Sequence, residues 1–285
     1  MMRGLIVLGA LAALTAPAHS QDSDADQVRP PASAPATVLQ RWQAPEARQG
    51  AAVDDAHFYA ITNARIGKYR RSDGTKVAEW VGDADAARAG RRIVHINSCA
   101  VIAAELVCAH SNFPHLPMAS SVEVFDTATL RHIRSIPLGL RAGSLTWLVR
   151  HEGHWWAGFA NYGERGGEPG RDHRFTRIAQ MDDNWQEIAS YALPADVLAA
   201  LAPMSASGGA FGPDGLLYMT GHDEPEIYQL RLPQQGAVLE WVGTIPAPLA
   251  GQAWAWDPTS LDGRWRIFGI RRATSEVIEF QLPDR

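Results

Sequence analysis

Short apolar segments recur along this chain at a nearly constant interval. They occupy residues 59–63, 108–112, 157–161, 218–222 and 267–271, so the step is 49 residues except for one longer step of 61. Each segment follows a second apolar run and a turn such as Glu152-Gly153, so each repeat contains a β-hairpin. A period of this length is typical of a propeller or a solenoid.

Four strands fit each repeat, which predicts an all-β fold with five blades of four antiparallel strands. The last repeat supplies only three strands, at 252–257, 265–271 and 276–282. The N-terminal segment 38–42 resembles the outer strands 77–80 and 238–241 in sequence. We therefore expect it to complete the last blade and close the ring. The other predicted strands are 51–54, 57–63, 65–70 and 76–80; 94–102, 105–111, 121–126 and 130–138; 144–151, 154–161, 175–182 and 186–193; and 208–213, 216–220, 226–232 and 237–245.

The N-terminal region has the pattern of a secretory signal peptide. Residues 1–20 combine Arg3, an apolar stretch and a small-residue cleavage site, Ala18-His19-Ser20. Residues 21–35 are rich in Asp, Pro, Ala and Ser and are expected to form a flexible leader. The propeller domain then covers residues 36–285, and the expected location is the periplasm or the exterior.

Composition narrows the range of partners. The formal net charge is −5, and no basic stretch alternates with aromatic residues, which argues against nucleic acid. No apolar run is long enough to span a bilayer. We expect a monomer that binds a small-molecule ligand.

Cys99 and Cys108 are the only cysteines. If their hairpin turns at Ala103-Ala104, the two residues lie directly opposite each other as a non-hydrogen-bonded pair, in which side chains are closest. A cross-strand disulfide is expected in an exported protein. Two buried thiols are the alternative.

The whole mature chain resembles secreted bacterial five-bladed propellers in architecture. This architecture is similar to that of glutaminyl cyclotransferase-like propellers, and more loosely to that of the six-bladed lactonase-like propellers. No catalytic signature of these families is present in the sequence, so the resemblance assigns no reaction.

In such a ring, the ends of the second strands converge on one face around the axis. These ends carry hydrogen-bonding residues in every blade: Asn63, Asn112, Asn161, His222 and Arg271. The opposite edge carries ordinary turns such as Asp214-Gly215. We therefore expect the functional site at the axial mouth formed by the polar ends.

Blade 2 carries the largest group of candidate residues. The register that pairs Cys99 with Cys108 places Asn97 opposite His110 and His95 opposite Asn112, all on one face of the hairpin. Two imidazoles and two amides would then share a patch beside the disulfide. The alternative is that the histidines form hydrogen bonds within a blade interface.

Two loops add reactive groups at this edge. The longer third repeat places its extra residues at 162–173, where Arg171, Asp172 and His173 offer an anion clamp and an acid–base pair. A solvated surface loop is the alternative. In blade 4, Asp223 or Glu224 could orient His222 or act as a base.

The favoured function is an exported enzyme that acts on a small polar or anionic molecule by general acid–base chemistry, as a hydrolase, lactonase or cyclase. The alternatives are a binding or scaffold protein without chemistry, and a divalent metal ion on the axis. The expected catalytic residues are His110, His222, Asp172 and Glu224. The expected substrate-binding residues are Asn63, His95, Asn97, Asn112, Asn161, Arg171, His173, Gln252 and Arg271.

Overall fold

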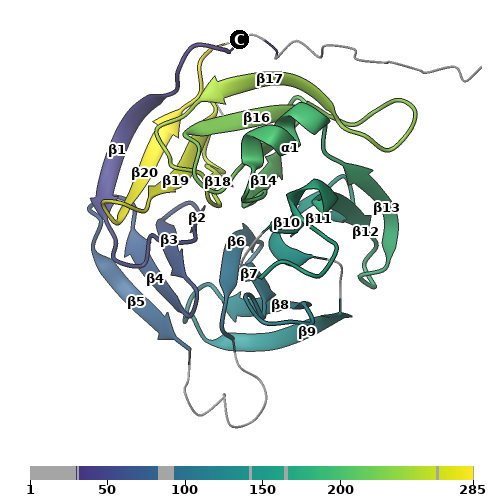
Figure 1. Ribbon diagram of the computed structural model, residues 1–285. Helices are drawn as coiled ribbons and strands as arrows, with labels where there is room; N and C mark the ends of the chain where they lie inside the picture. The colour runs from purple at the N-terminus through teal and green to yellow at the C-terminus, as the bar shows by residue number, and fades with distance from the viewer. Residues whose placement is uncertain are drawn as a thin grey trace, which may run out of the picture.

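The computed structural model describes residues 30, 32–82, 93–140, 143–163, 166–260 and 263–284. Within these ranges, five four-stranded antiparallel sheets surround a central axis as the blades of a propeller (Figure 1). The predicted fold is thus confirmed. The expected signal peptide and most of the expected leader, residues 21–29 and 31, lie outside the described residues.

The strands of each blade follow one another outward from the axis. Blade 1 contains β2 (Gly50–Val53), β3 (His57–Thr62), β4 (Arg65–Arg70) and β5 (Lys76–Val81). Blade 2 contains β6 (Ile96–Ile102), β7 (Glu105–Ser111), β8 (Ala119–Asp126) and β9 (His132–Leu140). Blade 3 contains β10 (Ser144–His151), β11 (His154–Ala160), β12 (Arg177–Met181) and β13 (Glu187–Ala192). Blade 4 contains β14 (Gly208–Phe211), β15 (Leu217–Thr220), β16 (Glu226–Arg231) and β17 (Glu240–Pro246).

The last blade joins the two ends of the chain. It contains β18 (Ala255–Trp256), β19 (Arg266–Arg271) and β20 (Glu276–Gln281), and β1 (Thr37–Gln43) pairs antiparallel with β20 as its outer strand. Figure 1 shows the purple β1 beside the yellow β20. The end of the expected leader is also attached, because Ser33 N donates to Thr244 O of blade 4 at 2.9 Å. The predicted ring closure is confirmed.

The hydrophobic core is divided among the blade interfaces. Each of the five clusters of buried residues joins two neighbouring blades; one contains Val107 and Val122 of blade 2 with Leu145 and Phe159 of blade 3. The apolar residues on the two faces of each blade therefore stabilise its contacts with the preceding blade and with the following blade. Among the described residues, every one of these clusters thus depends on two blades.

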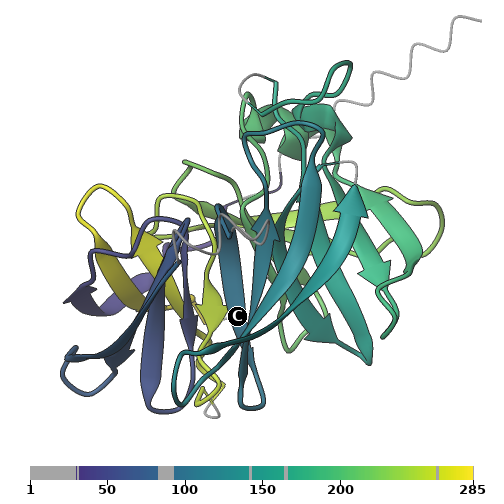
Figure 2. The same cartoon turned by 90° about the horizontal axis from the view of Figure 1, so that it is seen from below.

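In the described connections, two short helices occur. A 3₁₀ helix, η1 (His173–Phe175), lies in the long loop of blade 3, and α1 (Ala195–Leu201) connects blade 3 to blade 4. Figure 2 shows these green segments rising above the strand ends on one side of the ring. In the part of the chain that the structure describes, no helix is both long and apolar enough for a membrane span.

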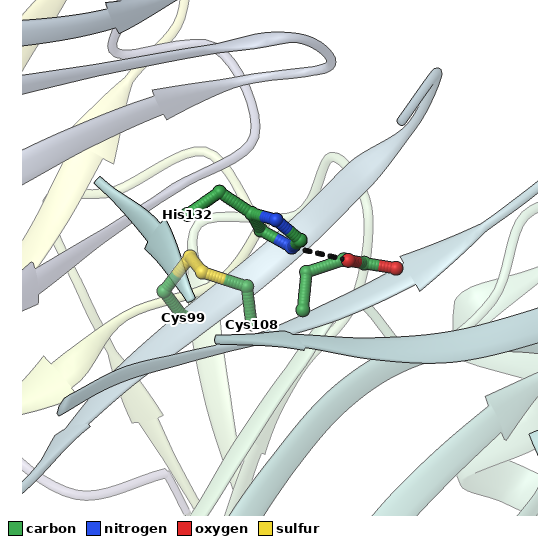
Figure 3. The surroundings of a disulfide bond; sticks show 4 residues. Cys99, Cys108 and His132 are labelled. Carbon is green, nitrogen blue, oxygen red and sulfur yellow. Dashed lines mark hydrogen bonds and ion pairs between the residues drawn. A yellow bond between two sulfur atoms is a disulfide. The ribbon is translucent and has the colours of Figure 1, made fainter. Parts of the chain in front are cut away.

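The predicted disulfide is confirmed. Cys99 and Cys108 are directly paired across β6 and β7, with their Cα atoms 4.0 Å apart. Figure 3 shows the imidazole of His132, from the outer strand of the blade, next to this disulfide.

The predicted register fails on the other side of Cys99. A β-bulge between Ile96 and Ser98 makes Ile96, and not Asn97, the partner of His110. An extra residue in one strand moves all earlier residues to the opposite face of the sheet. The expected patch with Asn97 opposite His110 and His95 opposite Asn112 therefore does not form.

Candidate functional site

A small polar cavity of about 150 Å³ lies on the axis at the predicted mouth. Every blade contributes to its lining, which consists of Gln49, His95, Asn97, Phe113, Thr146, Tyr162, Met204, Ser207, His222, Gln252 and Arg272. Four of the predicted site residues are thus brought together: His95, Asn97, His222 and Gln252.

His222 stands between a carboxylate and a guanidinium. Its Nδ1 lies 2.8 Å from Asp223 Oδ1, an electrostatic contact that falls outside hydrogen-bonding geometry. Its Nε2 lies 3.4 and 3.3 Å from the two terminal nitrogens of Arg272. An arginine N–H can only donate, so Nε2 is the acceptor and the proton of a neutral ring is on Nδ1, facing Asp223.

Arg272 brings a half-buried positive charge into the cavity. Burial lowers the pKa of its guanidinium, and the nearby Arg48 acts in the same direction, while Asp223 opposes them. Asp223 is 3.8 Å away, so Arg272 has no close bidentate carboxylate among the described residues. The arrangement favours a bound anion, for which the planar guanidinium offers two parallel donors.

Gln252 fixes the backbone beside His222. Its side-chain Nε2 donates to His222 O at 2.7 Å, and its backbone N donates to Gly221 O at 2.8 Å. Gln252 has a left-handed φ of 71°, and the preceding Gly251 has a φ of 60°. A Cβ on Gly251 would lie 2.3 Å from His222 C, so only glycine allows this approach.

A buried hydroxyl network forms the opposite wall. Asn97 Nδ2 donates to Leu145 O at 2.7 Å and to Ser111 Oγ at 3.3 Å, and Ser144 Oγ donates to Ser111 Oγ at 2.7 Å. The phenol of Tyr162 contacts Ser144, and burial raises its pKa to about 12. At neutral pH Tyr162 is therefore a protonated donor facing the cavity.

His110, a predicted proton carrier, lies elsewhere. It lies in the regular part of β7, on the same face as Cys108, where its Nε2 accepts from Val94 N at 3.1 Å and its Nδ1 is 2.8 Å from Ser121 Oγ. Burial lowers its pKa, against the opposing charge of Glu123. The alternative considered above, a histidine hydrogen-bonded inside the fold, describes His110.

The three asparagines at the strand ends brace loops and are not part of the cavity lining. Asn63 Oδ1 accepts from Gln49 Nε2 at 2.7 Å, which holds a residue that does line the cavity. Asn112 Nδ2 donates to Pro117 O at 2.9 Å, and Asn161 Nδ2 donates to Phe175 O at 3.1 Å.

The long loop of blade 3 forms a separate depression of about 450 Å³, lined in part by Arg171 and Asp172. Asp172 accepts from Arg174 N at the start of η1 and forms an ion pair with the Arg174 side chain at 2.7 Å. The hydrogen bonds from Arg174 lower the pKa of Asp172 to about 2. The carboxylate of Asp172 is therefore engaged in its ion pair with Arg174. Neither Asp172 nor His173 lines the cavity of His222.

In blade 4, Asp223 is the one of the two predicted carboxylates that contacts His222; Asp223 and Glu224 are both exposed, and neither lines the cavity. In blade 5, the residue next to the predicted one lines the cavity. Arg271 is exposed at the end of β19, whereas Arg272 turns into the cavity. Among the described residues, no group of three His, Cys, Asp or Glu is arranged to hold a metal ion.

Comparison with known proteins gives no assignment. No family model matches the chain, and no curated protein matches it. Among solved structures, a protein of unknown function from Bacteroides caccae is 9% identical, with a TM-score of 0.42 over 75% of this chain and 65% of its own. A chain of a mitotic checkpoint complex is 10% identical, with a TM-score of 0.43 over 98% and 100%. A chain of Kuenenia stuttgartiensis hydrazine synthase is 12% identical, with a TM-score of 0.43 over 81% and 69%. Similarity at this level carries no argument about function.

Proposed function

We propose that this five-bladed propeller is an exported enzyme that binds a small anionic molecule at the polar axial mouth and acts on it by general acid–base chemistry. The observation that carries the proposal is the meeting of His222 Nε2 with the guanidinium of Arg272, 3.3 Å apart, with Asp223 behind the imidazole. The signal-peptide pattern and the disulfide support export, because disulfides persist in oxidising compartments.

The proposed roles follow from the donors and acceptors. Arg272 binds a carboxylate or an oxyanion of the substrate and thereby releases its contact with His222 Nε2. The freed Nε2 lone pair takes a proton from the substrate or from water, and Asp223 stabilises the imidazolium that results. Tyr162, protonated at neutral pH, faces the cavity from blade 3 as the proton donor.

The size of the cavity limits the substrate. About 150 Å³ corresponds to roughly five water molecules at ~30 Å³ each, so the bound part of the substrate is small. Hydrolysis or cyclisation of a short lactone, ester or amide that carries an acidic group fits these residues best.

The experiment measures turnover of short carboxylate-bearing lactones, esters and amides by the full chain. His222→Ala is expected to lower kcat about 100- to 10,000-fold, which is the usual contribution of a general base. Arg272→Lys keeps the charge but loses the paired donors, so we expect mainly a higher KM. His154→Ala, at the opposite edge of blade 3, is the matched control and should leave both constants unchanged.

A binding protein without chemistry is the second candidate. It is favoured by the amides of Gln49, Asn97 and Gln252 in the cavity lining, because an amide can form hydrogen bonds with a ligand but does not transfer protons. Saturable binding of the same carboxylates, weakened by Arg272→Lys and without any product, would establish this reading. Unchanged turnover in His222→Ala would contradict the catalytic one.

A further inference from the structure

A second cavity, of about 770 Å³, lies at the other end of the axis, where the first and second strands of each blade are joined by turns. The inner strands β2, β6, β10, β14 and β18 all contribute to its wall. It shares no lining residue with the cavity of His222. Between them, the inner strands of blades 1 and 5 touch, because Gly50 and Ala253 form a β-bridge. A Cβ on Gly50 would lie 2.7 Å from Ala253 Cβ. The two cavities are therefore separate sites.

The wall of this larger cavity is mainly apolar and partly aromatic. Its lining includes Val101, Ile102, Leu148, Val149, Phe211 and Trp256. Trp256 Nε1 donates to Phe211 O at 2.9 Å, which holds the indole in place, and its ring meets that of Trp254 edge-on at 4.9 Å. A cavity of this size with fixed aromatic groups is typical of sites for organic ligands.

The polar groups of the cavity point to the kind of ligand. Ser98 is only 5% exposed, lines the cavity, and has no hydrogen-bond partner for its hydroxyl within the described ranges. Two carboxylates, Asp54 and Asp55, lie at the rim. Asp54 accepts hydrogen bonds from Tyr59 OH and from two backbone N–H groups and forms an ion pair with His57 only when that ring is protonated.

The positive charges at the cavity are already compensated. Arg150 is a lining residue, but it forms an ion pair with Asp183 at 2.5 Å and lies over the ring of Trp155. Arg71 contacts Asp54 O but makes two parallel bonds to Asp257, at 2.8 and 2.9 Å. The carboxylates of Asp54 and Asp55 thus leave a net negative rim above an aromatic wall.

We propose that this chamber, the cavity lined by Ser98, Phe211 and Trp256 with Asp54 and Asp55 at its rim, binds a lipophilic cation. The ligand class is an aromatic amine or a quaternary ammonium compound whose apolar body fills the chamber. Its positive charge lies against the two carboxylates and the indole face, as aromatic rings attract cations.

The test uses three probes of one shape: (2-naphthylmethyl)trimethylammonium, 2-naphthalenemethanol and 2-naphthoate. Binding to the full-length protein is measured by calorimetry and by the change in tryptophan fluorescence. We expect saturable binding of the cation, weaker binding of the alcohol, and the weakest binding of the anion. Equal affinities for all three, or no saturation of the cation at millimolar concentration, would overturn the proposal.

Variants place the probe in the chamber. Ala100 is partly exposed, lines the chamber and belongs to none of the core clusters, so Ala100→Phe should fill space and weaken cation binding at least tenfold. Ala128→Phe, the same change at an exposed turn, is the control and should leave the affinity unchanged.

Asp55→Asn, on an exposed side chain, tests the charge without touching the core. It should lower the affinity for the cationic probe by up to about fivefold and leave the affinity for the alcohol unchanged. Cation binding that Asp55→Asn and Ala100→Phe both leave intact would place the probe elsewhere and refute the site.

Discussion

At the scale of single residues, Glu123 shows how a polar cluster is held inside a blade. This carboxylate is 3% exposed and accepts hydrogen bonds from Ser121 and Ser135, each at 2.5 Å, and from His132 at 2.8 Å. Burial alone would raise the pKa of Glu123, but the hydrogen bonds from its partners outweigh this and lower it. His110, 3.9 Å away, is kept neutral because burial lowers its pKa.

This cluster predicts a stability that depends on pH. The folded-state pKa of His110 lies below the unfolded value of about 6.5, so its contribution is complete above that pH and is lost as the pH falls. Glu123 has a lowered pKa as well, so its contribution is lost in turn below about pH 4.5. We expect the free energy of unfolding in urea to fall as the pH is lowered from 7 to 5.

His110→Gln keeps a hydrogen-bond acceptor but cannot be protonated, and it separates the two steps. The variant should lose the decline between about pH 6.5 and 5 and keep the one at lower pH. Unfolding curves with the same pH dependence in both proteins would show that His110 is not the group responsible.

At the scale of elements, the β6–β7 hairpin depends on its disulfide. The bond closes a loop of about ten residues, which corresponds to roughly 2–3 kcal/mol of stability. We expect the double variant Cys99→Ser/Cys108→Ser to lose about this much in urea unfolding. Because the chain has no other cysteine, a reducing agent should destabilise the natural protein to the same extent and leave the variant unaffected. A natural protein insensitive to the reductant would contradict the prediction.

The elements also show how far sequence reasoning reaches. The repeat predicted the strands because each blade must place apolar residues on both faces, and this leaves a pattern in the sequence. The bulge at Asn97 left no such pattern, since one extra residue changes the register without changing the composition. The predicted register therefore placed His95 and Asn97, and not His110, on the wrong face of blade 2.

The helix α1, in contrast, could have been predicted from the sequence. The segment Ala195–Leu201, Ala-Asp-Val-Leu-Ala-Ala-Leu, is rich in strong helix formers and follows Pro194, yet α1 was not predicted. Strand ends in a ring must converge, and a cavity lined by His222 lies where this convergence was predicted. Which of two adjacent residues enters the cavity, as for Arg271 and Arg272, depends on how the chain leaves the strand and could not be read from spacing.

At the scale of the whole molecule, closure of the ring depends on β1. Trp42 of this strand is 9% exposed, and its ring lies 4.9 Å from that of Phe58 in blade 1 and 5.7 Å from that of Phe268 in blade 5. We expect Trp42→Ala to cost about 3–5 kcal/mol in urea unfolding, as for other large buried aromatic residues. Leu39→Ala, on the same strand but 46% exposed, is the control and should cost far less. Similar losses in the two variants would show that β1 does not close the ring through Trp42.

The pairing of β1 with β20 also sets the order of events during synthesis. The strand β1 leaves the ribosome about 240 residues before its partner. At ~5–20 residues per second this is a delay of roughly 12–48 s. During that time β1 has no sheet to join, and a prematurely terminated chain never provides one. Completion of the last blade thus distinguishes finished chains from fragments, which keep an unpaired strand that proteases can recognise.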